Sequence, residues 1–311
     1  MLRHSFIHMP GVGPSTERAL WKHAFYNWSD CLNRRTSKIF GYTMAATLRA
    51  YAQESENHLH NGDAAYFDRL LPRSESWRMY GDFRDNAAFV DIETTGSRGQ
   101  GEITVIGLYD GIRTKVFVRG KNLDDFKSEI RKYTLLVTYN GKYFDVPFMC
   151  DTFGNIFTRI AHIDLQYFLQ RLGYLGGLKE IQEQFGFRRD GVLSRLDGRY
   201  AIWLWEEYEK GNKKALNTLL RYNLEDTIVL QALAEAVYNE SVRLLPIQVV
   251  ELIPGRMPKI DIPYDEELVR KLGKRRTLRS HTYKIPVDLP DEGILQPIDI
   301  SPIPPPNTGL P

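Results

Sequence analysis

Residues 89–96 read Phe-Val-Asp-Ile-Glu-Thr-Thr-Gly, and this stretch sets the interpretation of the chain. Strand-forming residues surround Asp91 and Glu93, two carboxylates separated by one apolar residue. Because side chains alternate between the faces of a strand, both acids must point to the same face. Like charges held side by side are costly unless something positive lies between them, and a hard cation such as Mg²⁺ or Mn²⁺ is the simplest compensation. The alternative is a surface strand whose acids are merely solvated.

Composition and length limit the classes of protein to which this chain can belong. The 311 residues are enough for one large domain or two with a buried core. No apolar run approaches the roughly 18 residues of a membrane span, and the N-terminal residues lack the apolar core of a secretory signal. Cys31 and Cys150 are too far apart to form a ligand pattern, which argues against a disulfide scaffold or a cysteine-based zinc site. These features predict a cytoplasmic protein without membrane association.

The net charge of +2 is too small to indicate nucleic-acid binding by itself. The middle of the chain is slightly acidic and its two flanks are slightly basic. Any phosphate binding in the middle would therefore depend on metal ions.

Residues 1–80 are expected to form a small helical N-terminal region. A Pro-Gly-Val-Gly turn at residues 10–13 leads to Ser15, a candidate N-cap for an amphipathic helix. This stretch resembles the hairpin of a helix-hairpin-helix module, whose glycines let backbone amides approach a nucleic-acid phosphate. Only nine residues precede the turn, too few for a full first helix, so a packing hairpin without nucleic-acid contact is an equal alternative. Residues 40–71 are also expected to be helical.

Residues 81–240 are expected to form an α/β domain. Three strands come first, at residues 87–93, 103–109 and 113–118, and the Asp110-Gly111 pair between the last two is a hairpin signal. Further strands are expected at residues 135–139 and 159–163, and helices at residues 122–133, 146–153, 165–172, 177–185, 199–210 and 213–239. Meandering strands followed by alternating strands and helices indicate a mixed sheet flanked by helices. That order is expected of a ribonuclease H-like fold.

Residues 241–311 form a different kind of segment, with twelve of the sixteen prolines of the chain. Such a C-terminal extension should be extended or partly disordered near its end. Six of the ten residues at 270–279 are basic. This cluster is either a solvated surface or a contact for a nucleic-acid backbone.

Two further motifs add acids to the first pair. In residues 138–147, Thr-Tyr-Asn-Gly-Lys-Tyr-Phe-Asp-Val-Pro, a buried strand ends in a turn and Asp145 lies where a helix begins. By itself Asp145 could be only a helix N-cap. On a later helix, Tyr222 and Asp226 lie four residues apart and so share a face. A core-edge aromatic beside a surface acid is the alternative there.

Together the three motifs resemble the DEDD superfamily of 3′→5′ exonucleases in order, spacing and context. The tyrosine subtype (DEDDy) is the better match because Tyr222 lies four residues before Asp226. The histidine subtype would need a histidine at the position of Arg221. The motif that ends in Asp145 is also similar to the exonuclease domains of family B DNA polymerases. Over residues 87–240 the chain resembles stand-alone bacterial proteins of the YprB type.

The resemblance implies a nuclease that uses two Mg²⁺ or Mn²⁺ ions. Asp91, Glu93 and Asp226 would hold the ion that activates water, and Asp91 would bridge to a second ion. Asp145 would complete the site, and Tyr222 would orient the attacking water. The substrate would be DNA or RNA, with no sequence signal to choose between them. A structure-specific endonuclease and a non-catalytic nucleic-acid-binding protein remain alternatives.

Four neighbouring residues are expected to lie outside the site. Asp164 follows a strand and precedes a helix, which indicates an N-cap, and His162 is expected to be structural. Lys142, in a turn, is expected to be exposed. Glu225 should face away from Asp226 along their common helix.

Overall fold

The computed structural model describes residues 1–33, 36–187, 191 and 198–279, and its contacts divide the chain into two compact units, residues 1–272 and 273–311. The expected proline-rich end of the tail, residues 280–311, lies outside the described residues. The basic cluster at residues 270–279 falls in helix α12 (Glu266–Arg279). Its contact with nucleic acid and the expected domain boundaries stay predictions.

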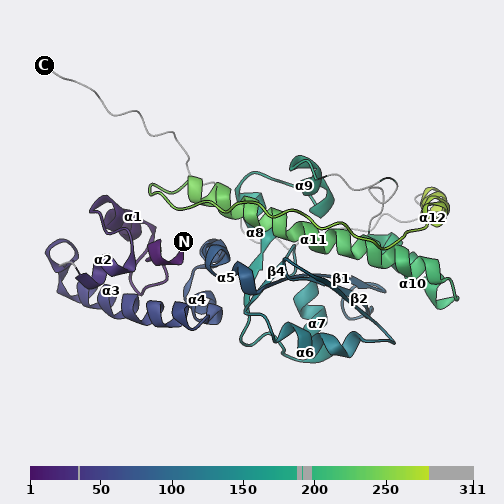
Figure 1. Cartoon of the computed structure of the whole chain (residues 1–311), viewed down its shortest axis with the longest axis horizontal. Helices are drawn as coiled ribbons and strands as arrows, with labels where there is room; N and C mark the ends of the chain where they lie inside the picture. Colours follow the sequence, from purple (N-terminus) through teal and green to yellow (C-terminus); the bar gives the residue numbers. More distant parts are fainter. Residues whose placement is uncertain (34–35, 188–190, 192–197, 280–311) are drawn as a thin grey trace, which may run out of the picture. The chain divides into compact units, whose positions relative to one another are not determined.

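A five-stranded mixed sheet carries the fold of the first unit (Figure 1). Its strand order is β3-β2-β1-β4-β5. Neighbours pair antiparallel from β3 to β1 and parallel from β1 to β5. The strands are β1 (Ala87–Thr94), β2 (Ile103–Tyr109), β3 (Thr114–Val118), β4 (Leu135–Thr138) and β5 (Ala161–Asp164). The expected ribonuclease H-like mixed sheet flanked by helices is confirmed.

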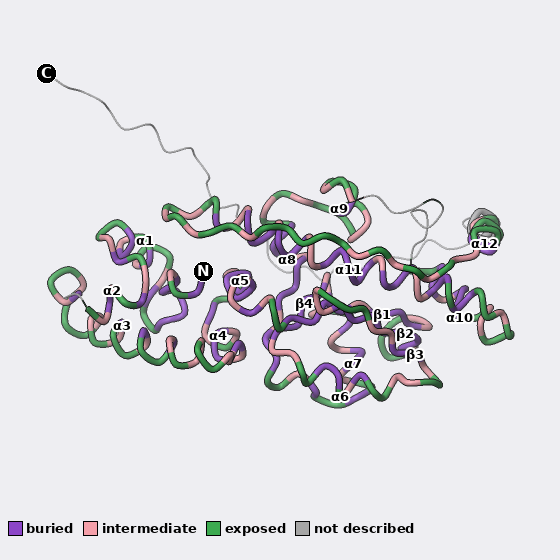
Figure 2. Tube along the Cα trace, in the orientation of Figure 1, coloured by how far each residue is buried: buried purple, intermediate pink, exposed green. Residues whose placement is uncertain are grey.

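Helices cover both faces of this sheet. One face carries α6 (Phe126–Ile130) and α7 (Asp145–Phe153), and the other carries the long helix α11 (Lys213–Arg243) (Figure 1). Figure 2 shows that β1, β2, β4 and β5 are mostly buried, as is the sheet-facing side of α11, whereas the first half of β3 is more exposed. The remaining elements between the strands and α11 are η4 (Leu123–Asp125), α8 (Leu165–Arg171), α9 (Leu178–Gln184) and α10 (Gly198–Glu209).

The alternation along β1 separates apolar from acidic side chains. Val90 and Ile92 pack in a cluster with Phe126 of α6 and Phe148 of α7. Asp91, between them, points the other way, because the side chain of Asn223 on α11 reaches it. The strand therefore presents its acids to α11 and its aliphatic residues to the opposite layer, as a side-chain period of two requires.

Helix α11 comes unusually close to the sheet opposite Asp91. Gly107 of β2 pairs with Asp91 in the antiparallel register. A Cβ atom added at Gly107 would lie 2.3 Å from Oδ1 of Asn223 and 2.4 Å from Oγ1 of Thr227. Only a residue without a side chain leaves room for the helix here, and this close approach brings one turn of α11 against the acidic face of β1.

The N-terminal region is helical, as expected, but its first helix begins earlier. Helix α1 starts at Pro14 with Gly13 as N-cap, so Ser15 is the second helical residue and its predicted capping role was wrong. The ring of proline fixes its φ angle near the helical value, and its missing N–H is not needed in the first turn. A start at Pro14 is therefore favoured. Only a three-residue 3-10 helix precedes the turn. The elements of this region are η1 (Leu2–His4), α1 (Pro14–Lys22), α2 (Trp28–Asn33), α3 (Ser37–His60), α4 (Ala64–Leu70), η2 (Arg73–Met79), α5 (Tyr80–Phe83) and η3 (Arg84–Asn86).

A buried ion pair fixes the turn before α1. The Glu17 carboxylate accepts hydrogen bonds from both terminal nitrogens of Arg78, at 2.9 and 3.0 Å, and from the backbone amides of Phe6 and Ile7 at 2.7 and 3.1 Å. Both side chains of the pair are less than 5% exposed. All of these partners are hydrogen-bond donors, so the burial of the carboxylate is compensated within the protein.

After α11 the chain runs back along that helix as an extended strap, residues 248–265 (Figure 1). Polar side chains of α11 hold the backbone of the strap at four points. The pairs are Asn239 with Leu252, Glu235 with Gly255, Arg221 with Ile260 and Thr218 with Asp265. An isolated extended segment cannot pair its own backbone groups with one another. The side chains of α11 provide hydrogen-bond partners for the strap instead.

Candidate active site

Three of the predicted carboxylates meet between β1 and α11. Asp91, Glu93 and Asp226 each offer a carboxylate oxygen, and these three oxygens lie within 4.8 Å of one another. Glu93 and Asp226 are buried, at 7% and 5% exposure, and Asp91 is partly exposed. The sheet supplies the first two acids, and the close approach of α11 over Gly107 supplies the third. The fold therefore brings together residues that lie far apart in the sequence.

Asn223 orients Asp91 from one side. Its amide group donates hydrogen bonds to Oδ2 of Asp91 at 2.8 Å and to the Asp91 backbone oxygen at 3.2 Å. No sequence signal pointed to this residue, because the contact exists only once α11 lies across β1. A side-chain amide in this position turns the carboxylate toward Glu93 and Asp226.

Asp145 reaches the same site from α7. It is the first residue of that helix and does not act as its N-cap. Its Oδ1 accepts a hydrogen bond from the Ile92 amide at 3.2 Å, which places it beside β1. Burial raises the pKa of Asp145 well above its ordinary value, and the charge of Asp91 raises it further. A hollow of about 350 Å³ is lined by Asp145 together with Asp91 and Glu93.

The donor set suits a hard divalent cation. Carboxylate oxygens are the ligands that Mg²⁺ and Mn²⁺ prefer, and three of them converge here. A cation would also offset the repulsion that gathering like charges creates. The acidic cluster could therefore hold a metal ion, and nothing in its chemistry distinguishes magnesium from manganese.

Tyr222 lies one turn before Asp226 on α11. Its side chain is buried, at 5% exposure, in a cluster with residues of α10. The Lys179 ammonium group lies 4.8 Å from the centre of the Tyr222 ring, over its face. Lys179 was not predicted as a site residue. One signal was legible: it lies in the first turn of α9, where the helix dipole disfavours a positive charge.

Two of the residues expected outside the site have structural roles. Asp164 is the N-cap of α8 and accepts a hydrogen bond from the Gln166 amide at 3.2 Å. His162 makes a 2.8 Å hydrogen bond to the Thr138 hydroxyl, and burial lowers the pKa of its imidazole to about 3. His162 is therefore neutral and structural, as predicted. Lys142 is half-buried in its turn rather than fully exposed.

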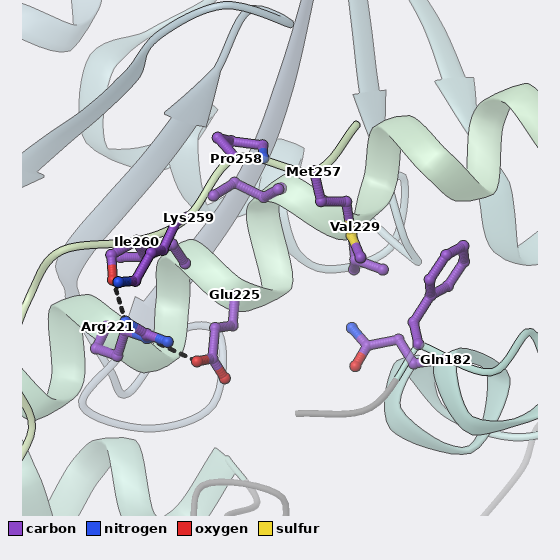
Figure 3. A pocket seen from close by; sticks show the side chains of 10 residues that line it. Gln182, Arg221, Glu225, Val229, Met257, Pro258, Lys259 and Ile260 are labelled. Atoms are coloured by element: carbon purple, nitrogen blue, oxygen red, sulfur yellow. Dashed lines mark hydrogen bonds and ion pairs between the residues drawn. The ribbon is translucent and has the colours of Figure 1, made fainter. Parts of the chain in front are cut away.

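Glu225 points away from the carboxylate cluster, as predicted. Its Oε1 accepts a 2.7 Å hydrogen bond from Arg221, which also donates to the Ile260 backbone oxygen on the strap (Figure 3). These groups line a second hollow, of about 260 Å³, between α11, α9 and the strap. Arg221 and Tyr222 are adjacent in sequence, but Arg221 lines this hollow while Tyr222 packs against residues of α10.

No helix among the described residues is both long enough and apolar enough to cross a membrane.

A comparison with protein families concerns the stretch that carries these acids. Residues 88–238 match the family model described as the RNase_H superfamily. Among solved structures, the chain is similar to a family B DNA polymerase from the hyperthermophilic archaeon Pyrobaculum calidifontis, with 18% identity and a TM-score of 0.37. That similarity covers 49% of this chain and 25% of the polymerase chain. No curated protein matches the sequence. The family match supports a nuclease activity in general.

Proposed function

Starting from a ribonuclease H-superfamily domain at residues 88–238, we propose that the protein is a metal-dependent 3′→5′ exonuclease that hydrolyses phosphodiester bonds of DNA or RNA. The observation that carries the proposal is the convergence of Asp91, Glu93 and Asp226, together with a hollow that Asp145 lines beside Asp91 and Glu93. We also propose that the nuclease is of the DEDDy type and that it is related to YprB-type proteins.

The four acids would hold the cofactor, two Mg²⁺ or Mn²⁺ ions. When bound, such ions make a water molecule more acidic and stabilise the charge that develops on the leaving oxygen. Asp91, Glu93 and Asp226 would hold one ion, Asp91 would also help to hold the second, and Asp145 would complete the site. Asn223 keeps the Asp91 carboxylate turned toward this centre.

Two further groups, Tyr222 on α11 and Lys179 on α9, would act on the substrate in this proposal. The Tyr222 hydroxyl would orient the attacking water as a hydrogen-bond partner. The Lys179 ammonium group, held over the ring of Tyr222, would attract the phosphate that is being cleaved. Replacing Tyr222 by phenylalanine should therefore lower the rate without abolishing it.

End-labelled substrates test the proposal. Single- and double-stranded DNA and RNA, labelled at the 3′ or the 5′ end, would be incubated with the protein and Mg²⁺, Mn²⁺ or EDTA. Stepwise shortening from the 3′ end that requires metal is the expected result. Discrete internal products would instead indicate an endonuclease. A gel shift without cleavage would indicate a nucleic-acid-binding protein, and absence of Mn²⁺ binding in a calorimetric titration would rule out the two-metal site.

A further inference from the structure

The turn that delivers Asp145 has an unusual backbone. It joins β4 to α7, and Asn140 within it has a φ of 60°, in the left-handed region that is rare for residues other than glycine. At the next residue, Gly141, an added Cβ atom would lie 2.2 Å from Oγ1 of Thr138. The turn is therefore pressed against the end of β4 in a conformation that surrounding contacts must maintain.

Asp164 supplies those contacts. It is the last residue of β5 and is paired with Thr138 in the parallel register. One carboxylate oxygen accepts the Asn140 amide at 2.8 Å, and the other accepts the Lys142 amide at 3.0 Å. Two backbone amides that converge on one anion form a nest. Because Asp164 is only 5% exposed, water cannot easily replace it, and its loss would leave both amides without an acceptor.

The same turn is hydrogen-bonded to the residues on both sides of Asp145. The Gly141 carbonyl accepts the Val146 amide at 2.9 Å, and the Asn140 carbonyl accepts the Phe144 amide at 3.2 Å. A shift of the turn would therefore move the start of α7. Because the Asp145 carboxylate must meet the Ile92 amide and the neighbouring acids, such a shift would displace it from the site.

We propose that Asp164 is a positioning residue that holds the turn at residues 140–142 and thereby aims Asp145 at the metal-binding carboxylates. The inference rests on the proposed function, in which Asp145 contributes to metal binding. The simpler alternative is that Asp164 only caps α8 through the Gln166 amide. A cap alone would leave the turn independent of this side chain.

A matched control separates the two roles. Asp63 is also an aspartate N-cap, of α4, and accepts the Tyr66 amide at 3.1 Å in the N-terminal region. The three variants Asp164→Ala, Asp164→Asn and Asp63→Ala would be compared with the wild type. Hydrogen exchange of residues 138–146 is measured by mass spectrometry, and Mn²⁺ binding by calorimetry.

In Asp164→Ala we expect faster exchange in residues 138–146 and an affinity for Mn²⁺ that falls by roughly 10–100-fold, as for other residues that orient metal ligands. Asp164→Asn keeps one acceptor oxygen and should lie between alanine and wild type. If the alanine variant does not fold, the comparison of Asp164→Asn with the wild type still tests the proposal. Asp63→Ala should leave both measurements at the wild-type level.

Unchanged exchange of residues 138–146 in the folded Asp164 variants would overturn the inference, and so would an equal change in Asp63→Ala. The proposed function fails separately, if the wild type cleaves no nucleic acid under any metal condition. In that case the exchange measurement still decides whether Asp164 holds the turn.

Discussion

Two carboxylate sites, one in the N-terminal region and one at the sheet, stand in contrast in this molecule. In the N-terminal region Glu17 is surrounded by donors, with Arg78 and two backbone amides on its oxygens. Between β1 and α11, three carboxylates face one another within 4.8 Å. The first arrangement joins opposite charges and stabilises a fold, whereas the second gathers like charges and costs stability. Glu17 has its cation within the chain, whereas the three gathered carboxylates need a cation from outside it.

The largest expected effect comes from removing one of the gathered acids. Asp91→Asn should reduce nuclease activity to that of a control with EDTA, because the residue would bind both ions in the proposal. Its thermal stability without metal should be equal to or above the wild type, since a like charge is removed. End-labelled substrate assays and thermal unfolding in EDTA measure the two effects. A clear loss of stability together with retained activity would place Asp91 with Glu17, as a structural acid.

Breaking the opposite-charge pair should do the reverse. Arg78→Met leaves Glu17 buried without its cation and should cost roughly 3–5 kcal/mol of stability. The activity of the fraction that remains folded should be unchanged, because the pair lies outside the site. Urea unfolding measures the loss, and the double variant with Glu17→Gln should recover part of it. Equal losses in single and double variants would show that the pairing itself matters little.

The contact between α11 and the sheet can be tested at Gly107. Gly107→Ala would place a Cβ atom against Asn223 and Thr227, and overpacking of this kind typically costs about 1–3 kcal/mol. It should also weaken Mn²⁺ binding, because Asp226 would move away from β1. Gly13→Ala in the N-terminal region is the matched control, since no atom lies within 4 Å of its added Cβ. Normal Mn²⁺ affinity in Gly107→Ala would mean that the close approach is not needed for the site.

The smallest expected effect concerns two histidines, the buried His8 in the N-terminal region and the half-buried His162 in the α/β region. Burial lowers the pKa of His8 and of His162 to about 3. The unfolded chain binds these protons near pH 6.5, so stability is full above that pH and falls as the pH drops toward 3. At pH 5.5 each histidine should cost roughly 1 kcal/mol. Urea unfolding at pH 7.5 and 5.5 tests this, and each histidine-to-glutamine variant should show a smaller pH dependence; an undiminished slope would assign it to other groups.

Much of the fold could be predicted because its signals are local. Alternating and continuous apolar runs fix the five strands, and the Asp110-Gly111 pair marks the hairpin between β2 and β3. The period of two along β1 is enough by itself to place Asp91 and Glu93 on one face. The acids of α7 and α11 followed from the family resemblance, whereas their convergence with β1 depends on how the helices pack on the sheet.

The misses have long-range causes. Asn223 meets Asp91 only because α11 packs on the sheet, and Lys179 meets Tyr222 only because α9 packs beside α11. No short motif encodes the packing of α11 on the sheet. The second role of Asp164 depends on β5 lying beside β4. Ser15 is an exception with a local cause: it was misassigned as a cap because α1 starts at Pro14, two residues before the helix that Ser15 would cap. Local patterns thus predict the acids, while their supporting residues depend on contacts between distant segments.

The strap along α11 sets a limit on chain length. Between its anchors at Gly255 and Ile260 only five residues of backbone must follow the helix from Glu235 to Arg221. That helical distance is about 21 Å at roughly 1.5 Å per residue, whereas five extended residues span at most about 18 Å. The long side chains of Glu235 and Arg221 make up the difference. Deleting a single residue here would release an anchor, whereas an added residue could bulge outward. Related chains should therefore differ in this segment by insertions and not by deletions.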